Sequence, residues 1–323
     1  MAVFTEVSEQ AARELLARYD VGDFVSIKPI ASGIENTNYF LSTTQGEWVL
    51  TLFERLKPEE LPFYLELAAH LAAKGCRVAA PLRTRQGTLW TFLAGKPAAL
   101  ANRLYGESVR SMGVAECRSM GRLLGEMHSA AQDFSLFQDN LRGLSWWQAT
   151  LPGLKTYLPE TLFDDLASEV RFFAEASARP DWRSLPLIAC HCDLFRDNAL
   201  IAEAGTPQAR VAGVFDFYFA GCVPRLYDLA VVVNDWCVDD ATGRLNHGTM
   251  KALMDAYHDV NPLTPTEKAL WRTALRAAAT RFWMSRLNDF YKPRQASLLK
   301  PHDPTHFERV LHDRRRCPLY WPA

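Results

Sequence analysis

The sequence predicts an α+β fold in two parts, a small antiparallel sheet followed by a larger helical region. Short apolar runs separated by Gly and Pro turns fill the first third of the chain, which is typical of a sheet. After Gly106, apolar and small residues recur at helical spacing. Two short apolar runs, 185–189 and 211–215, interrupt the helices and enclose a polar loop. We therefore expect an N-terminal lobe over residues 1–102 and a C-terminal lobe over residues 103–323.

Turn and helix signals divide the N-terminal lobe into short elements. Helical spacing predicts a first helix over residues 8–19, with Ser8 as its N-cap. A second helix begins near Pro62, because proline favours the first turn, and ends at Gly75, because glycine favours the position after the last turn. Around these helices we expect strands at residues 25–30, 38–42, 47–54, 78–82, 88–93 and 98–100.

Long stretches of helical spacing dominate the C-terminal lobe. In the first of them Gly121 and Gly125 lie one turn apart. Since glycine lowers helix stability, we expect this face to pack closely against a neighbouring element. The expected helices lie at residues 109–130, 162–176, 226–236, 248–258, 266–290 and 304–312, with a further helix beginning at Trp146.

The overall composition is that of an ordinary globular protein. Of 323 residues 48% are hydrophobic and 23% charged, and the formal net charge of −1 gives no electrostatic reason to expect nucleic acid or a membrane surface as a partner. No apolar run approaches the roughly 20 residues of a membrane-spanning helix, and no signal peptide is expected. The scattered cysteines indicate a reducing cytoplasm, and Cys190-x-Cys192 lacks a second pair to complete a zinc site. The composition leaves a monomer and a homodimer equally open.

The polar loop carries the residues of a candidate phosphoryl-transfer site. It reads His191-x-Asp193-Leu-x-x-x-Asn198, and the apolar run that follows ends at Asp216. If the two flanking strands are neighbours, these side chains converge. One carboxylate can then orient a hydroxyl and accept its proton, while amide and carboxylate oxygens can bind Mg²⁺. Short polar residues also cap turns, but the second aspartate after a strand favours the functional interpretation.

Further stretches accompany this loop. They are Gly33-Ile-Glu-Asn-Thr-Asn-Tyr39, Val49-Leu-Thr-Leu-Phe-Glu54, Asp216-Phe-Tyr-Phe219, Asn234-Asp-Trp-Cys237 and Arg281-Phe-Trp-Met-Ser-Arg-Leu287. Together with the two-part layout they resemble the protein-kinase-like fold in its aminoglycoside/choline phosphotransferase family, and within that family the bacterial homoserine kinases. The resemblance implies a small antiparallel-sheet lobe, a larger helical lobe, and ATP and Mg²⁺ as cofactors.

The resemblance also implies roles for the loop residues. Asp193 would be the catalytic base that faces the acceptor hydroxyl. Asn198 and Asp216 would hold Mg²⁺ on the ATP phosphates, and His191 would brace the loop through the backbone near Asp216. Asp228 matches the structural aspartate that follows the metal site in this family, although a buried helix N-cap is an equal alternative.

For the nucleotide, the resemblance implies a site in the cleft between the lobes, where ligands often bind. Val49 would cover the adenine ring, and the backbone from Ala101 to Leu104 would meet its edge. The turn that would cover the phosphates consists of Ser32, Gly33, Ile34, Glu35 and Asn36.

One position departs from many relatives of this fold. Protein kinases and many aminoglycoside kinases have a lysine in the third strand where this chain has Thr51, although the homoserine kinases share the threonine. Lys28 or Arg55 could replace that lysine, although an exposed Lys28 is the commoner outcome. Among rival functions, an inactive nucleotide-binding module is therefore the least favoured.

The acceptor implied by the resemblance is L-homoserine, which is small and carries a carboxylate, an ammonium and a hydroxyl. Its carboxylate calls for an arginine and its ammonium for an acid. A cationic acceptor such as choline, an aminoglycoside or an amino alcohol would disfavour an arginine in the pocket, so the position of Arg281 relative to Asp193 distinguishes these alternatives. Arg281 and Arg286 point about 140° apart on one helix. The candidate pocket residues are Arg196, Tyr218, Asp235, Trp236, Arg281 and Arg286.

Overall fold

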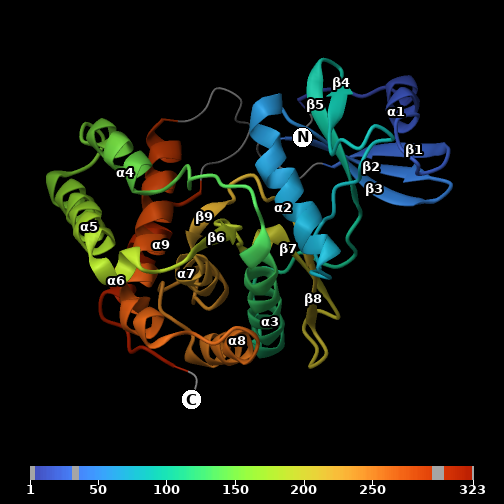
Figure 1. Cartoon of the computed structure of the whole chain (residues 1–323). Coiled ribbons are helices and arrows are strands. Elements are labelled where there is room, and N and C mark those ends of the chain that lie inside the picture. Colours follow the sequence, from blue (N-terminus) through green and yellow to red (C-terminus); the bar gives the residue numbers. More distant parts are fainter. Residues whose placement is uncertain (1–3, 31–35, 293–301, 322–323) are drawn as a thin grey trace. The chain divides into compact units, whose positions relative to one another are not determined.

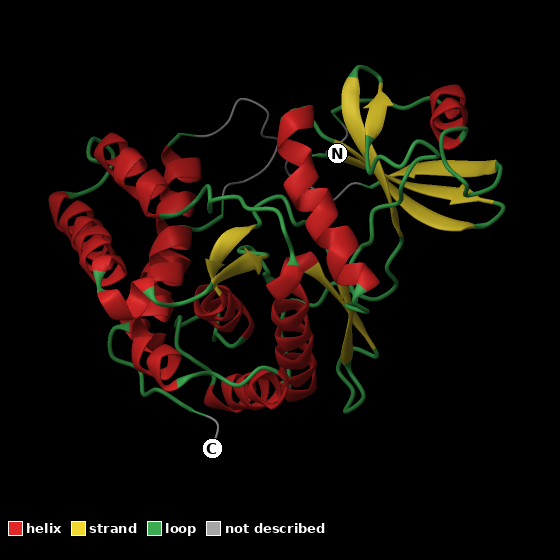
Figure 2. Cartoon of the chain, viewed as in Figure 1, coloured by secondary structure: helices red, strands yellow, loops and turns green. Residues whose placement is uncertain are grey.

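The computed structural model describes residues 4–30, 36–292 and 302–321. The chain divides into two compact units, Met1–Tyr105 and Gly106–Ala323, which we call unit 1 and unit 2 and describe separately (Figures 1 and 2). No helix formed by the described residues is long and apolar enough to cross a membrane.

Unit 1 is built on an antiparallel sheet, as the sequence predicts, and the sheet has five strands in the order β1-β2-β3-β5-β4. Helix α1 begins after Ser8, whose side chain accepts a hydrogen bond from the Ala11 amide, as expected of the N-cap. The strands are β1 (Phe24–Pro29), β2 (Thr37–Thr43), β3 (Gly46–Leu52), β4 (Thr91–Leu93) and β5 (Lys96–Asn102), and the helices are α1 (Glu9–Leu16) and α2 (Leu61–Ala73).

The two faces of this sheet differ in chemistry because side chains alternate along each strand. Leu50 and Leu52 of β3 belong to a buried apolar cluster that includes residues of α1. Val49 and Thr51 lie on the opposite face, where Thr51 is paired with Asn38 of β2. The hydroxyl of Thr51 donates to Asn38 Oδ1 at 2.8 Å, so Thr51 belongs to a neutral hydrogen-bonded pair.

The strand expected at residues 78–82 is wrong. This segment follows β5 and exchanges single backbone hydrogen bonds with it, from the Leu82 amide to the Leu100 carbonyl and from the Asn102 amide to the Ala80 carbonyl. Pro81 has no amide hydrogen to donate, and the segment forms isolated bridges, at Val78 and between Pro81 and Ala101, instead of a regular strand.

Unit 2 is mainly helical, and its four last helices begin and end within two residues of the predicted positions. A pair of small sheets lies among the helices. The helices are α3 (Val114–Ala130), α4 (Leu144–Thr150), α5 (Glu160–Ala178), α6 (Pro180–Arg183), α7 (Arg225–Trp236), α8 (His247–Val260), α9 (Pro265–Tyr291) and α10 (Thr305–Arg314). The strands are β6 (Leu187–Cys190), β7 (Ala199–Ala202), β8 (Arg210–Val214) and β9 (Gly221–Pro224).

Helices α3 and α8 pack at backbone contact through the two predicted glycines. A Cβ atom at Gly121 would lie 2.1 Å from the carbonyl oxygen of Leu253, and one at Gly125 would lie 3.0 Å from Val260 Cβ. The glycines thus lower the stability of α3 locally but permit a close approach that no larger residue allows, which confirms the prediction.

The strands around the polar loop are not the direct neighbours that the sequence suggested. β6 pairs with β9, and β7 pairs with β8, in two separate two-stranded sheets. β7 and β9 span only four residues each, too few to show a clear alternation in sequence. The loop residues are therefore brought together by hydrogen bonds between β7, β8 and the loop, not by pairing of β6 with β8.

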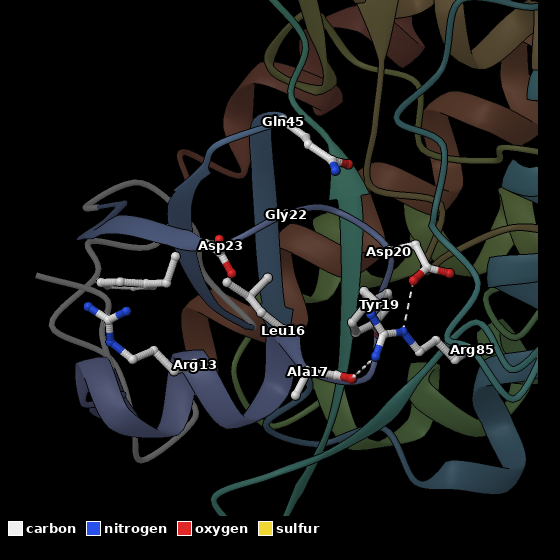
Figure 3. Close-up of a pocket in the computed structure, with 10 residues that line it drawn as sticks. Arg13, Leu16, Ala17, Tyr19, Asp20, Gly22, Asp23, Gln45 and Arg85 are labelled. Carbon is white, nitrogen blue, oxygen red and sulfur yellow. Dashed lines mark hydrogen bonds and ion pairs between the residues drawn. The ribbon is translucent and has the colours of Figure 1, made fainter.

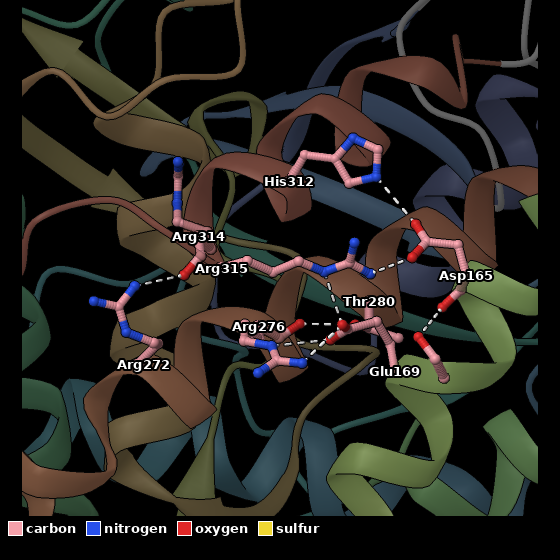
Figure 4. Close-up of polar contacts among 9 residues, drawn as sticks. Asp165, Glu169, Arg272, Arg276, Thr280, His312, Arg314 and Arg315 are labelled. Carbon is pink, nitrogen blue, oxygen red and sulfur yellow. Dashed lines mark hydrogen bonds and ion pairs between the residues drawn. The ribbon is translucent and has the colours of Figure 1, made fainter.

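Ion pairs fix the long helix α9 to its surroundings. At its start, Thr264 and Glu267 form a reciprocal capping box, and Arg225 of α7 donates two hydrogen bonds to Glu267, at 2.6 and 2.7 Å. Further along, Arg276 pairs with the buried Glu169 of α5 at 2.8 Å, which also accepts from Arg315 beyond α10 (Figure 4). Helix α9 is thus held at two levels along its length.

We predict that Glu267→Gln lowers the free energy of unfolding by about 3 kcal/mol at pH 7, because it leaves the Arg225 guanidinium half-paired in a buried site. Burial alone would raise the pKa of Glu267, but its bonds with Arg225 and Thr264 hold it below its ordinary value of 4.5. The carboxylate therefore stabilises the fold above that value, and the stabilisation is lost as the pH falls through the lower folded-state pKa.

Urea denaturation at pH 7 and in steps down to pH 4 measures this effect. The difference in the free energy of unfolding between wild type and Glu267→Gln should narrow below pH 4.5. A difference that widens there would contradict a lowered pKa for Glu267 in the folded state. Glu160→Gln, an exposed glutamate in the first turn of α5, is the control and should change stability little at any pH.

Candidate active site

The polar loop begins with a turn that a buried carboxylate helps to hold in place. Cys192 adopts a left-handed backbone conformation, with φ of 61°, which is costly for a residue other than glycine. Its amide donates to Asp228 Oδ1 at 2.7 Å. Asp228 is fully buried in the first turn of α7, and although burial would raise its pKa, hydrogen bonds and nearby histidines keep that pKa below its ordinary value. The turn that precedes Asp193 is thus fixed by an ionised aspartate.

Two further buried residues complete this support, and sequence reasoning missed both. His128 of α3 donates from Nε2 to Asp228 Oδ2 at 3.0 Å, and its Nδ1 accepts from the Tyr257 hydroxyl of α8 at 2.9 Å. A single histidine within an apolar helix carries no sequence signal that separates it from an ordinary core residue. The chain of bonds joins the loop to three helices.

His191 braces the loop in one defined tautomer. Its Nε2 donates to the carbonyl oxygen of Phe215 at 3.0 Å, and its Nδ1 accepts from the amide of Asp193 at 3.3 Å. Burial lowers the pKa of His191, so the ring is neutral, as both bonds require. This backbone bond next to Asp216 is the contact that the sequence resemblance implied.

A backbone hydrogen bond brings Asn198 close to Asp216. The amide of Phe215 donates to the carbonyl oxygen of Asn198 at 3.1 Å, and Asp216 follows directly, with a left-handed φ of 68°. The Asn198 side chain donates from Nδ2 to the carbonyl oxygen of Asp193 at 2.8 Å. This leaves its amide oxygen as a potential ligand, beside the exposed Asp216.

A buried guanidinium lies against Asp193. Arg281 of α9 is 3% exposed, and its Nη1 donates to Asp193 Oδ1 at 2.9 Å. Two aromatic rings lie near this guanidinium, with Cζ 3.6 Å from the centroid of Phe282 and 5.6 Å from that of Phe219. The predicted base therefore has a fixed cationic neighbour.

Three other candidate pocket residues form hydrogen bonds that stabilise the loop. Asp235 accepts from the Arg196 amide at 2.7 Å and from Arg196 Nε at 3.1 Å, and Arg196 also pairs with Asp240 at 2.8 Å. Trp236 donates from its indole to the carbonyl oxygen of Leu194 at 3.1 Å. Arg196, Asp235 and Trp236 are thus occupied with one another and with the loop, so their contact with substrate stays a prediction.

Arg286 lies next to a cluster of three aromatic rings, the aromatic trio. Phe195, Phe282 and Phe307 form the trio, with ring centroids 4.3 to 5.7 Å apart. Arg286 Cζ is 4.5 Å from the centroid of Phe307, and burial lowers the pKa of this arginine. It forms no ion pair with any residue that the structure describes. Tyr218 is half-buried, directly beyond the Asp216 turn.

The residues expected at the nucleotide belong mostly to unit 1. Ser32, Gly33, Ile34 and Glu35 lie outside the described residues. Asn36 precedes β2, and Val49 and Ala101 are paired across β3 and β5 on the face that carries Thr51, with Leu104 just beyond the strand. Lys28 and Arg55 are both exposed. Contact of these residues with a nucleotide stays a prediction.

An open polar hollow on unit 1 is lined by none of the predicted site residues (Figure 3). It lies between α1 and the start of β1, and Arg85 crosses it to bond Asp20 at 2.8 Å and the carbonyl oxygen of Ala17 at 3.1 Å. Both members of the ion pair are largely exposed, so the hollow is a surface feature without the chemistry of phosphoryl transfer.

A metal site built on the loop cysteines is not supported. His128, Cys190 and Asp228 bring potential ligand atoms within 4.8 Å of one another. However, His128 and Asp228 already share a hydrogen bond, and burial raises the pKa of Cys190 well above its ordinary value, so that the thiol stays protonated. The cluster is a structural network.

Comparison with known proteins identifies the family. The model of the phosphotransferase enzyme family matches residues 26–263. The chain therefore belongs to the phosphotransferase enzyme family, which confirms the resemblance seen in the motifs. It is 49% identical over 321 residues to a homoserine kinase of Paraburkholderia phytofirmans, covering 97% of this chain and 96% of the relative. It is 50% identical, with the same coverage, to a homoserine kinase of Paraburkholderia xenovorans.

Solved structures confirm the protein-kinase-like α+β fold. An amicoumacin kinase in complex with AMP-PNP and Ca²⁺ aligns with a TM-score of 0.67 at 14% identity, covering 96% of this chain and 92% of that one. A Plasmodium vivax ethanolamine kinase aligns with a TM-score of 0.62 at 13% identity, covering 98% and 96%. At such identities the likeness concerns the fold alone.

We predict that Asp228→Asn lowers kcat at least tenfold and the free energy of unfolding by about 2 kcal/mol, because the left-handed turn before Asp193 loses its charged acceptor. Steady-state kinetics and urea denaturation measure the two effects. Asp255→Asn, a half-exposed aspartate on α8, is the control and should change neither quantity appreciably. An unchanged kcat in Asp228→Asn would show that the turn does not need the carboxylate for catalysis.

Proposed function

We propose that this protein transfers the γ-phosphoryl group of ATP to the hydroxyl of L-homoserine and so forms O-phospho-L-homoserine, a step of threonine biosynthesis. The observation that carries the proposal is the buried Arg281 guanidinium 2.9 Å from Asp193, because it places a cation where the acceptor must bind. Near-full-length similarity to homoserine kinases supports the same acceptor.

The reaction follows from the positions of the loop residues. Asp193 orients the acceptor hydroxyl and takes its proton, while the hydroxyl oxygen bonds to the γ-phosphorus and the bond from that phosphorus to the bridging oxygen breaks, releasing ADP. Asn198 and His191 keep Asp193 in place through bonds to its carbonyl oxygen and its amide. Most of the rate enhancement then comes from positioning.

A magnesium ion suits the oxygen atoms that Asn198 and Asp216 carry. Asn198 offers an amide oxygen and Asp216 a carboxylate, and both are the hard oxygen ligands that Mg²⁺ prefers. When bound, the ion would neutralise the phosphate charge that develops during transfer. The seven buried cysteine thiols are compatible with a reducing cytoplasm as the place of action.

The alternative acceptors fit the site less well. Choline and aminoglycosides are cationic, and a buried arginine beside the base would repel them. An inactive nucleotide-binding module is disfavoured because Asp193, Asn198 and Asp216 are all retained on an ordered backbone. The neutral pair of Thr51 and Asn38 means that phosphate charge must be met elsewhere.

An acceptor panel tests the proposal directly. With Mg·ATP and purified protein, we expect ADP release with L-homoserine at least a hundredfold faster, in kcat/KM, than with choline, ethanolamine or an aminoglycoside. Turnover of choline without turnover of homoserine would overturn the proposal. ADP release without any acceptor sets the background.

Two variants separate the base from the metal ligand. Asp193→Asn should reduce kcat about a thousandfold while leaving ATP binding intact, because it removes proton acceptance and not nucleotide contacts. Asp216→Ala should instead abolish Mg²⁺-dependent ATP binding. Isothermal titration with Mg·ATP and steady-state kinetics distinguish the two outcomes, and full turnover by Asp193→Asn would exclude Asp193 as the base.

A further inference from the structure

The hydrogen-bonding capacity of Arg281 is only partly used. A guanidinium presents five N–H donors in one plane. Among the described residues, the one hydrogen bond of this side chain runs from Nη1 to Asp193 Oδ1. Arg281 is 3% exposed, and its other nitrogens are not among the fully buried side-chain atoms that lack a partner, so these N–H groups are accessible to a bound acceptor.

The surroundings of Arg281 restrict where that acceptor can lie. Phe282 lies 3.6 Å and Phe219 5.6 Å from Cζ, and the N–H donors of a guanidinium all lie in its plane, so additional bonds form along its edge, as the bond to Asp193 does. An acceptor bound there would lie side by side with the base. A planar carboxylate matches two neighbouring N–H groups of a guanidinium edge.

We propose that Arg281 bonds Asp193 and the carboxylate of the acceptor amino acid at the same time, and so sets the distance between that carboxylate and the hydroxyl to be phosphorylated. This inference rests on the proposed function and adds to it a residue that determines specificity. The guanidinium positions the base through Nη1 and holds the substrate through its remaining N–H groups.

Two consequences follow for the choice of acceptor. An amino alcohol without a carboxylate cannot make the charged contact with the guanidinium edge, and the loss of that contact strongly reduces kcat/KM. An amino acid with a shorter side chain, such as L-serine, cannot reach both the guanidinium and the base, so it loses one of the two contacts. The arginine thus selects acceptors that carry a carboxylate and whose side chain is long enough to reach Asp193.

A cycle of two enzymes and two acceptors tests the proposal. The acceptors are L-homoserine and 3-aminopropan-1-ol, which is homoserine without its carboxylate. In the wild type we expect kcat/KM to be at least a hundredfold higher for homoserine. In Arg281→Gln this ratio should fall at least tenfold. A general structural effect would lower kcat/KM for both acceptors by the same factor and would leave the ratio unchanged.

Helix α9 offers a matched control. Arg276 also stacks on a phenylalanine, with Cζ 3.4 Å from the centroid of Phe172, and also pairs with a carboxylate of another element, Glu169, at 2.8 Å. Arg276→Gln therefore removes the same kind of contacts away from Asp193. The ratio between the two acceptors should remain at its wild-type value, even if the variant is less stable.

A second variant covers the case in which Arg281→Gln does not fold. Arg281→Lys keeps the charge but not the planar edge, and it should lower the preference for homoserine over L-serine at least tenfold. An unchanged ratio in each folded variant would overturn the proposal. Absence of homoserine turnover in the wild type would instead refute the proposed function, so the two failures are distinguishable.

Discussion

The geometry of the candidate site depends on one buried carboxylate. Asp228 accepts the amide of Cys192 and thereby stabilises a left-handed turn that this residue would not adopt by itself. The turn directs the chain into Asp193, whose amide and carbonyl oxygen are then bonded by His191 and Asn198. Because His128 bonds the Asp228 carboxylate and is itself bonded by the Tyr257 hydroxyl, the packing of α3, α7 and α8 is linked to the loop through hydrogen bonds.

A second level of organisation comes from helix α9. Its start is fixed by Glu267 and Arg225, its middle by Arg276 and Glu169, and its next turns carry Arg281 to Asp193. The loop places the carboxylate and the helix places the guanidinium, so the pair forms only when both are correctly packed. The site therefore combines residues of the polar loop with Arg281, which lies 88 positions after Asp193 in the chain.

Much of this architecture could be predicted from the sequence. Long periodic segments identified α7 to α10, and the spacing of Asp193, Asn198 and Asp216 singled out the loop. The helix predictions succeeded because helical periodicity is a local signal, and the role of the loop residues stays a prediction.

The remainder depends on contacts that no local pattern encodes. The four-residue strands β7 and β9 are too short to alternate visibly, and Pro81 turned an expected strand into a bridge. In the sequence His128 cannot be distinguished from any core histidine, because its contact with Asp228 is visible only in the folded structure. The sequence named Arg281 as a candidate together with five others, and only the fold separates it from Arg196, which is already paired.

The anchoring of α9 also limits how this part of the gene can change in length. Each residue added or removed between Glu267 and Arg281 would rotate everything beyond it by about 100° around the helix axis and shift it by about 1.5 Å. Arg281 would then leave Asp193, and Arg276 would leave Glu169 if the change preceded it. Substitutions can accumulate on the exposed side of this segment, but insertions and deletions cannot, so functional relatives should align here without gaps.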